Sequence, residues 1–179
     1  MQPPPVLSGL ELPVTAASVG PALRAVCHEV RLPLPGGGRT LARWQQLAEV
    51  SSADLTLGRL LEAHADALAI RAELGAATVP DDQLWGVWAA EARAARLTAR
   101  RTDGRWRLSG RKAWCSGALV LDRALVTAAT DDGPRLFAVE TCDVRTVEGS
   151  WSAVGLSATG SLTVEVPDAK AEPVGGSGD

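Results

Sequence analysis

The chain has 179 residues, of which 46% are hydrophobic and 22% charged, and its formal net charge is −3. This length allows one domain or two small ones with a real hydrophobic core. The small and well-mixed charge argues against nucleic acid or an anionic membrane surface as a partner.

The chain also lacks the patterns of a membrane or secreted protein. No apolar run approaches the about 20 residues that cross a bilayer, and the proline-rich start has no signal-peptide pattern. The three cysteines, Cys27, Cys115 and Cys142, are far apart and odd in number. This usage predicts reduced thiols in a cytoplasmic protein, and no metal site.

The first 79 residues have the apolar periodicity of helices. A first helix is expected over residues 17–32 and a second over 39–50, after a break at the prolines and glycines of 33–38. Their apolar stripes are Val19, Leu23, Val26 and Val30 in the first helix and Leu41, Trp44 and Leu47 in the second.

A third helix is expected between Ser51 and Gly75. Ser51 with Asp54 three residues later matches a capping box, and Gly75 stands where a helix-ending glycine is expected. The apolar stripe consists of Leu57, Leu60, Leu61, His64 and Leu68. We expect this stripe to pack against the second helix, and we expect His64 to be buried and hydrogen-bonded rather than a ligand or base.

After Pro80 the pattern changes to short segments typical of strands, with hairpin signals at Asp103-Gly104 and at 131–134. The expected strands cover 85–90, 97–102, 105–115, 122–129, 135–140, 144–147 and 161–166. Their spacing predicts an antiparallel barrel or sandwich. The sequence therefore predicts an α+β chain: a helical domain over 1–79, an antiparallel β-barrel-like domain over 80–174, and a tail over 175–179 without structural signal.

Five of the six tryptophans lie in the β region, where large aromatic side chains most often fill a core. Trp114 is the best candidate for stacking on a flat aromatic ligand, because it ends a long predicted strand. The Ser116 hydroxyl, two residues on, can reach a ring nitrogen of such a ligand, and Gly117 lets the backbone approach it. The alternative for Ser116 is a turn residue without a ligand.

Three further groups have simpler interpretations. Cys115 is expected in the core, and Glu91 as a solvated charge at a strand end. A solvated hairpin face, rather than a phosphate site, is the preferred interpretation of the basic cluster Arg100, Arg101, Arg105, Arg107, Arg111 and Lys112.

Residues 108–118, Leu-Ser-Gly-Arg-Lys-Ala-Trp-Cys-Ser-Gly-Ala, resemble the middle-domain flavin strand of acyl-CoA dehydrogenases, whose pattern is Gly-x-Lys-x-Trp-Ile-Thr/Ser. The preceding hairpin and the segments 124–128 and 151–166 fit the same family. The third predicted helix resembles the last long helix of the family's N-terminal domain. The resemblance thus covers most of the chain after Arg39.

This resemblance implies an FAD-dependent enzyme that oxidises an acyl-CoA to its enoyl-CoA. It places the Trp114 ring against the isoalloxazine and the Ser116 hydroxyl at the flavin N5 edge. It places the backbone of Trp88, Ala89 and Ala90 at the pyrimidine side. It allows an acyl-CoA or similar small molecule as substrate, an electron-transfer flavoprotein as partner, and a homo-oligomer as assembly.

The chain also departs from the family. Residues 90–96, Ala-Glu-Ala-Arg-Ala-Ala-Arg, stand where the family has Thr-Glu-Pro-Gly-Ala-Gly-Ser-Asp, so the contacts of that loop do not carry over. The family's C-terminal helical domain with its catalytic carboxylate is absent, and no catalytic residue is assigned here. We therefore expect little or no dehydrogenase activity from this chain alone. Two alternatives stay open: a flavin monooxygenase of the same fold, and a truncated, non-catalytic interaction module.

Overall fold

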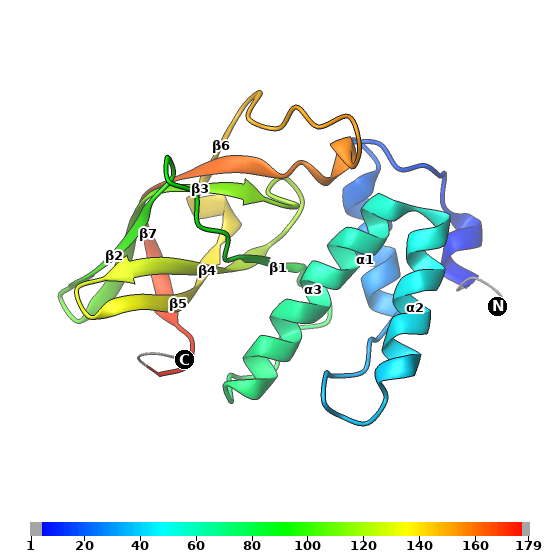
Figure 1. Ribbon diagram of the computed structural model, residues 1–179, viewed down its shortest axis with the longest axis horizontal. Coiled ribbons are helices and arrows are strands. Elements are labelled where there is room, and N and C mark those ends of the chain that lie inside the picture. Colours follow the sequence, from blue (N-terminus) through cyan, green and yellow to red (C-terminus); the bar gives the residue numbers. More distant parts are fainter. Residues whose placement is uncertain (1–4, 177–179) are drawn as a thin grey trace.

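In the computed structural model, three helices lie beside a small β-barrel (Figure 1). The structure describes residues 5–176, so the proline-rich start and the expected tail at 175–179 lie partly outside the described residues. The helices are α1 (Val19–Glu29), α2 (Thr40–Ala53) and α3 (Leu55–Glu73). Short 3-10 turns are η1 (Pro5–Gly9), η2 (Thr141–Asp143) and η3 (Ser157–Thr159).

Five strands close the barrel. The strands of the sheet are β1 (Trp85–Trp88), β2 (Leu97–Thr102), β3 (Arg105–Cys115), β4 (Arg123–Thr130), β5 (Gly133–Glu140), β6 (Arg145–Val147) and β7 (Leu162–Pro173). β4, β2, β3, β7 and β5 pair in that order, and β5 pairs back with β4. β1 pairs with the first half of β4, and β6 pairs with β7.

The expected α+β order of helices followed by a barrel is confirmed, but the expectation of a purely antiparallel sheet is wrong. β1 and β2 both run parallel to β4. The two hairpins with local turn signals, β2–β3 and β4–β5, form as expected. Parallel pairing joins strands through a longer crossover, which leaves no turn signal in the sequence. The barrel is therefore mixed.

Asp54, not Ser51, caps α3. The Asp54 Oδ1 accepts the Leu57 backbone N–H at 3.0 Å, while Ser51 lies in the last turn of α2. There it packs so closely on Gly58 that a Cβ on Gly58 would lie 2.1 Å from the Ser51 Oγ. This contact lets α2 pass directly into α3. Gly75 follows the end of α3 with a φ of +68°, as the sequence predicts.

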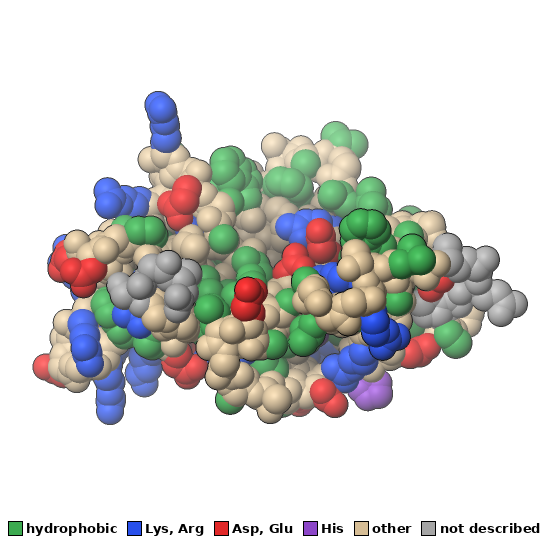
Figure 2. Space-filling model, turned by 60° about the horizontal axis from the view of Figure 1, so that its bottom comes forward, with side chains coloured by type: hydrophobic (Ala, Val, Ile, Leu, Met, Phe, Trp, Pro, Cys, Tyr) green, Lys and Arg blue, Asp and Glu red, His purple; other side chains and the backbone are tan. Residues whose placement is uncertain are grey.

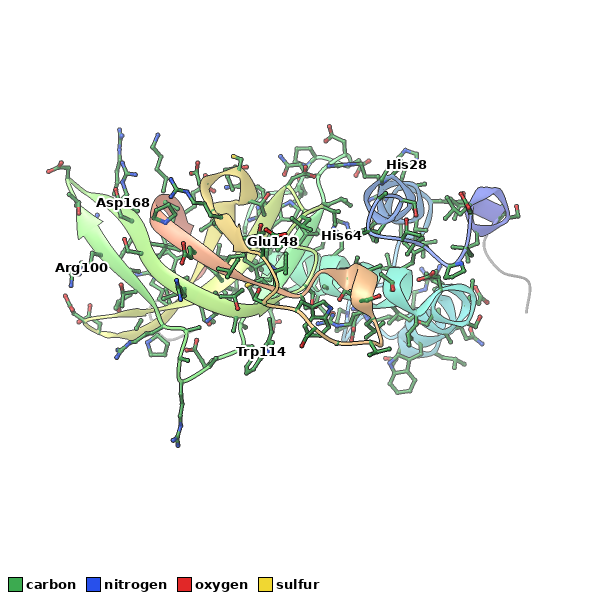
Figure 3. The ribbon with its side chains drawn as sticks, turned by 90° about the horizontal axis from the view of Figure 1, so that it is seen from above. His28, His64, Arg100, Trp114, Glu148 and Asp168 are labelled. Atoms are coloured by element: carbon green, nitrogen blue, oxygen red, sulfur yellow. The ribbon has the colours of Figure 1, made fainter. Side chains whose placement is uncertain are left out.

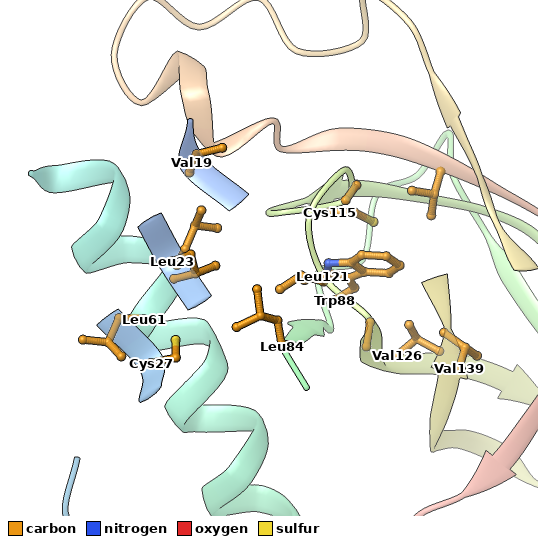
Figure 4. Packing of buried hydrophobic residues seen from close by; sticks show 14 of the residues in the cluster. Val19, Leu23, Cys27, Leu61, Leu84, Trp88, Cys115, Leu121, Val126 and Val139 are labelled. Atoms are coloured by element: carbon orange, nitrogen blue, oxygen red, sulfur yellow. The ribbon is translucent and has the colours of Figure 1, made fainter. Parts of the chain in front are cut away.

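One hydrophobic cluster joins the helices to the barrel (Figure 4). Leu23 of α1 and Leu61 of α3 are buried, and they face Leu84, Trp88 and Leu121 at the near end of the barrel. The α3 stripe therefore packs on α1 and the barrel and not on α2 alone. This shared core fixes α3 relative to β1.

The second helix contacts α3 through a buried polar pair, and of its expected apolar side only Leu47 packs against the core. Leu41 and Trp44 are 67% and 64% exposed. Arg43 is buried instead, and its guanidinium donates to Asp66 of α3 at 2.7 Å. On the face drawn in Figure 2, acidic and basic side chains lie interspersed, in agreement with the mixed charge of the sequence. Within residues 5–176, none of the helices combines the length and the apolar character needed to cross a membrane.

Candidate functional site

A cleft of about 500 Å³ opens between α3, the ends of β1 and β3, and the loop over residues 151–161. This volume lies within the range of small-molecule sites. The cleft is lined by all five residues that the sequence singled out for a cofactor, Trp88, Ala89, Ala90, Trp114 and Ser116. The structure thus brings together two segments that lie about 25 residues apart in the chain.

Trp114 turns its indole out of the barrel at the end of β3 (Figure 3). Alternation along β3 puts Leu108 and Lys112 inside and would put residue 114 inside as well. The register of β3 against β7 shifts between Lys112 and Cys115, and Trp114 has a φ of +58°. Cys115 therefore takes the buried position, and Trp114 is 56% exposed. A non-glycine residue in this conformation stores strain, which is commonest at functional sites.

Trp88, in contrast to Trp114, has its indole inside the core. Its side chain is only 2% exposed and belongs to the core, and its Nε1–H donates to the Ser116 carbonyl at 3.1 Å. Only the backbone of Trp88 can face a ligand, while Ala89 and Ala90 are exposed beyond it. The indole of Trp88 thus fixes the turn that carries Ser116.

The Ser116 hydroxyl belongs to a chain of hydroxyl groups. Its Oγ lies 2.8 Å from the Ser161 Oγ, which lies 2.9 Å from the Thr159 Oγ1. The Thr159 hydroxyl donates to the Leu156 carbonyl at 2.8 Å. Ser161 and Thr159 are both buried. This chain connects the end of β3 to the far wall of the cleft.

Gly117 serves packing rather than the approach of a ligand. Its φ is +73°, and a Cβ there would lie 3.0 Å from Leu121 and 3.2 Å from Leu60. The sequence predicts that this glycine lets the backbone approach a ligand, but in the structure it allows close packing against α3. Its backbone N–H donates to the Thr159 carbonyl at 2.8 Å, which again links the two walls.

Lys112 does not belong to a solvated hairpin face, because its side chain is only 1% exposed. Its Nζ donates to Glu91 Oε1 at 2.6 Å, to Thr127 Oγ1 at 2.7 Å and to the Thr127 carbonyl at 2.9 Å. The bond from Lys112 holds the pKa of the Glu91 carboxyl below its usual value. Glu91 is exposed as expected, but it is paired. Since Glu91 directly follows Ala89 and Ala90, Lys112 anchors the segment that lines the cleft.

His64 and Cys115 have the structural roles expected of them. The His64 Nδ1 accepts the Trp85 backbone N–H at 3.1 Å, and burial, with help from Arg31, lowers the pKa of its imidazole to about 4. Cys115 is fully buried in the core, and burial raises the pKa of its thiol to about 12.

Sequence reasoning missed the wall formed by α3 and the loop over 151–161. Its polar members are Arg59, Asp66, Thr159 and Ser161. Asp66 is the one carboxylate among the lining residues, and it is paired with Arg43 at 2.7 Å. Leu156, with a φ of +56°, is a second non-glycine residue in the left-handed region at this cleft. Such a conformation leaves no sequence signal for a leucine.

No protein-family model and no curated protein matches the chain. Solved structures do match. FkbI, described as serving biosynthesis of the methoxymalonyl extender unit of Fk520, matches with a TM-score of 0.67 and 22% identity, over 97% of this chain and 54% of that chain. TdsC from Paenibacillus sp. A11-2 with FMN and indole matches with a TM-score of 0.60 and 22% identity, over 96% and 53%. XiaF from Streptomyces sp. with FADH2 and glycerol matches with a TM-score of 0.57 and 21% identity, over 89% and 41%.

The chain has the fold of these proteins. It spans about half the length of the structures it matches. At about 22% identity, this likeness shows the fold and no particular activity.

The descriptions of the matched structures also name the reactions and the flavins of those proteins. TdsC is described as a dibenzothiophene monooxygenase, and MsuC from Pseudomonas fluorescens, another match, as a methanesulfinate monooxygenase. One of these matched structures contains FMN and another contains FADH2.

Proposed function

We propose that the cleft binds a flavin, and that this chain supplies one wall of the active site of a flavin-dependent monooxygenase. The observation that carries the proposal is the exposed indole of Trp114, held on strained backbone beside the Ser116 hydroxyl at a cleft of about 500 Å³. A strained, exposed aromatic ring is costly for stability alone, and ligand stacking gives it a use.

The residues present fit a flavin. Trp114 offers a flat face for the isoalloxazine, Ser116 offers a hydroxyl for its N5 edge, and the exposed backbone at Ala89 and Ala90 can receive the pyrimidine side. Arg59 is the one cation on the lining and would pair with a flavin phosphate. A bound flavin supplies the electron transfer to dioxygen, and the protein supplies position and electrostatics.

Each wall residue then has a defined task. Trp114 orients the ring and covers it from water, and Ser116 fixes the ring's rotation through one hydrogen bond. Trp88 and Lys112 act from behind, because they hold the Ser116 carbonyl and the Glu91 carboxylate. The site is therefore preorganised by the barrel core.

Oxygen insertion is preferred over dehydrogenation because of the matched structures, since in the acyl-CoA dehydrogenase family the base lies on the C-terminal domain and not on this wall. Removal of a proton α to a thioester needs a base within hydrogen-bond reach of that proton. Asp66, the carboxylate on the lining, is already paired with Arg43. The descriptions of TdsC and MsuC as monooxygenases support the same choice. The substrate in this proposal is a small organic molecule, and the flavin is FMN or FAD.

Flavin titration tests the proposal. Purified chain is titrated anaerobically with oxidised and with reduced FMN and FAD, and binding is followed by flavin absorbance. We expect binding of at least one flavin, weakened about tenfold or more in Trp114→Leu, since stacking of a flat ring contributes about 1–3 kcal/mol. Trp44→Leu is the matched control, because Trp44 is 64% exposed and lies away from the cleft on α2.

The outcomes decide the proposal directly. Absence of binding by the unmodified chain, or equal binding by Trp114→Leu, would rule it out. Turnover of an acyl-CoA series with an artificial electron acceptor would instead restore the dehydrogenase interpretation.

A further inference from the structure

Three hydroxyl groups of residues that line the cleft form a continuous chain of hydrogen bonds from Ser116 through Ser161 to Thr159. The chain ends on the Leu156 carbonyl, 2.8 Å from the Thr159 Oγ1. A hydroxyl group has one proton to donate and two lone pairs with which to accept. The direction of such a chain is therefore fixed as soon as one end is fixed.

The Leu156 carbonyl fixes the direction of the hydrogen bonds in this chain. The Leu156 oxygen can only accept, so Thr159 uses its single proton on that bond. Thr159 must then accept from Ser161, and Ser161 must accept from Ser116. All three bonds can form together only in this direction. The Ser116 proton consequently points toward the Ser161 oxygen, and a lone pair of the Ser116 oxygen is left for a ligand.

The surroundings hold this arrangement in place. Ser161 is 6% exposed and Thr159 is 2% exposed, so bulk water does not compete for their hydroxyl groups. The Trp88 Nε1–H holds the Ser116 carbonyl at 3.1 Å. The Leu156 carbonyl also accepts the Thr159 backbone N–H at 3.0 Å and the Trp151 Nε1–H at 3.3 Å. Reversal of the chain would cost the bond from the Thr159 hydroxyl to the Leu156 carbonyl, which would then keep only its two N–H donors.

We propose that Thr159 and Ser161 make Ser116 a hydrogen-bond acceptor and thereby make the cleft select reduced over oxidised flavin. The proposal rests on the proposed function, in which Ser116 meets the flavin N5. In a reduced flavin N5 carries a hydrogen and donates, whereas in an oxidised flavin N5 has a lone pair and accepts. An acceptor at Ser116 therefore forms a hydrogen bond with N5 of the reduced flavin. Toward N5 of the oxidised flavin, it would place one lone pair against another, which is unfavourable.

The preference has a size that experiment can resolve. One hydrogen bond gained in one state and an unfavourable contact in the other correspond to about a tenfold difference in dissociation constant. By linkage, a tenfold preference for the reduced form raises the two-electron midpoint potential of the bound flavin by about 30 mV. Thr159 and Ser161 act through Ser116, so they are positioning residues.

The test is the ratio of dissociation constants for oxidised and reduced FMN and FAD, measured anaerobically. We expect the unmodified chain to bind the reduced form about tenfold more tightly. Ser161→Ala and Thr159→Val each free the Ser116 proton to donate to oxidised N5, so the ratio should fall toward one. Thr159→Ser keeps the hydroxyl and should keep the ratio. Ser157→Ala, an exposed hydroxyl in the same η3 turn, is the matched control and should change nothing.

The outcomes separate this inference from the proposed function. Binding of neither redox form would overturn both. Binding of both forms with equal affinity by the unmodified chain would overturn the inference and leave the flavin site standing. So would an unchanged ratio in both Ser161→Ala and Thr159→Val. Because Ser161→Ala only removes an oxygen, it tests the inference even if Thr159→Val does not fold.

Discussion

The two walls of the cleft are held in different ways. The barrel wall, at the ends of β1 and β3, is fixed from behind by the buried side chains of Trp88 and Lys112. The loop wall, over residues 151–161, is held by short-range hydrogen bonds that converge on the Leu156 carbonyl. A change in the barrel wall therefore disturbs the whole core, whereas the loop wall can change with little effect on global stability.

Lys112 gives the largest test of that difference. Lys112→Ala removes a fully buried side chain and leaves the Thr127 carbonyl without its donor, so it should lower the free energy of unfolding by about 4 kcal/mol. Urea unfolding measures this value. Lys112→Met loses the same donor but keeps most of the volume, so it should cost less, about 2 kcal/mol. Equal losses of unfolding free energy in the two variants would show that packing of the Lys112 methylene groups does not support the barrel wall.

His64 tests how the barrel wall is joined to α3. Its pKa of about 4 in the fold lies below its ordinary value of 6.5, so between these pH values the unfolded chain holds more protons. The free energy of unfolding should therefore fall by about 3 kcal/mol as pH drops through this window, beyond the loss caused by other groups.

A matched variant isolates that effect. His64→Asn keeps an acceptor for the Trp85 N–H but does not titrate, so unfolding at pH 7 and pH 4 should show a smaller loss in the variant. An equal loss of unfolding free energy in both proteins would show that titration of His64 does not cause the pH dependence.

Trp88→Phe sharpens the comparison within the barrel wall. It shrinks a core ring and leaves the Ser116 carbonyl without its indole donor. We expect a loss of about 2 kcal/mol in the free energy of unfolding, again by urea unfolding, and weaker flavin binding. Unchanged flavin binding with lowered stability would separate the Ser116 turn from the ligand.

Trp151→Phe is the same change in the loop wall and should have the smallest effect. The indole donor is lost, but the Leu156 carbonyl keeps the bonds from Thr159. A loss of about 0.5 kcal/mol is expected, because Trp151 is only half-buried. A loss as large as that of Trp88→Phe would show that both walls belong to the cooperative core.

The sequence was most informative where its signals are local. The α1 and α3 stripes, the helix-ending Gly75 and the Asp103-Gly104 hairpin all specify structure within a few residues, and each forms. The five cofactor residues were found through a motif, and the structure places them on one cleft. Their role toward a flavin stays a prediction.

What the sequence did not reveal depends on long-range pairing. Ser116 and Ser161 lie 45 residues apart, and no local pattern predicts their contact. The parallel pairing of β1 with β4 has no turn signal. Lys112 sits among arginines in the sequence, and its burial shows only in the fold, where its Nζ bonds to Thr127 of β4. The Trp114 exposure follows from a register shift that alternation alone would not give.

The bond from the Trp85 N–H to His64 has a further consequence for solubility. β1 is an end strand of the sheet, and such strands offer unpaired N–H and C=O groups to other chains. α3 covers this strand and supplies, through an imidazole nitrogen, the acceptor that a neighbouring strand would otherwise provide. The helix α3 therefore protects the edge of β1 from pairing with a strand of another chain. Partial detachment of α3 would expose this edge, with its two tryptophans, to self-association.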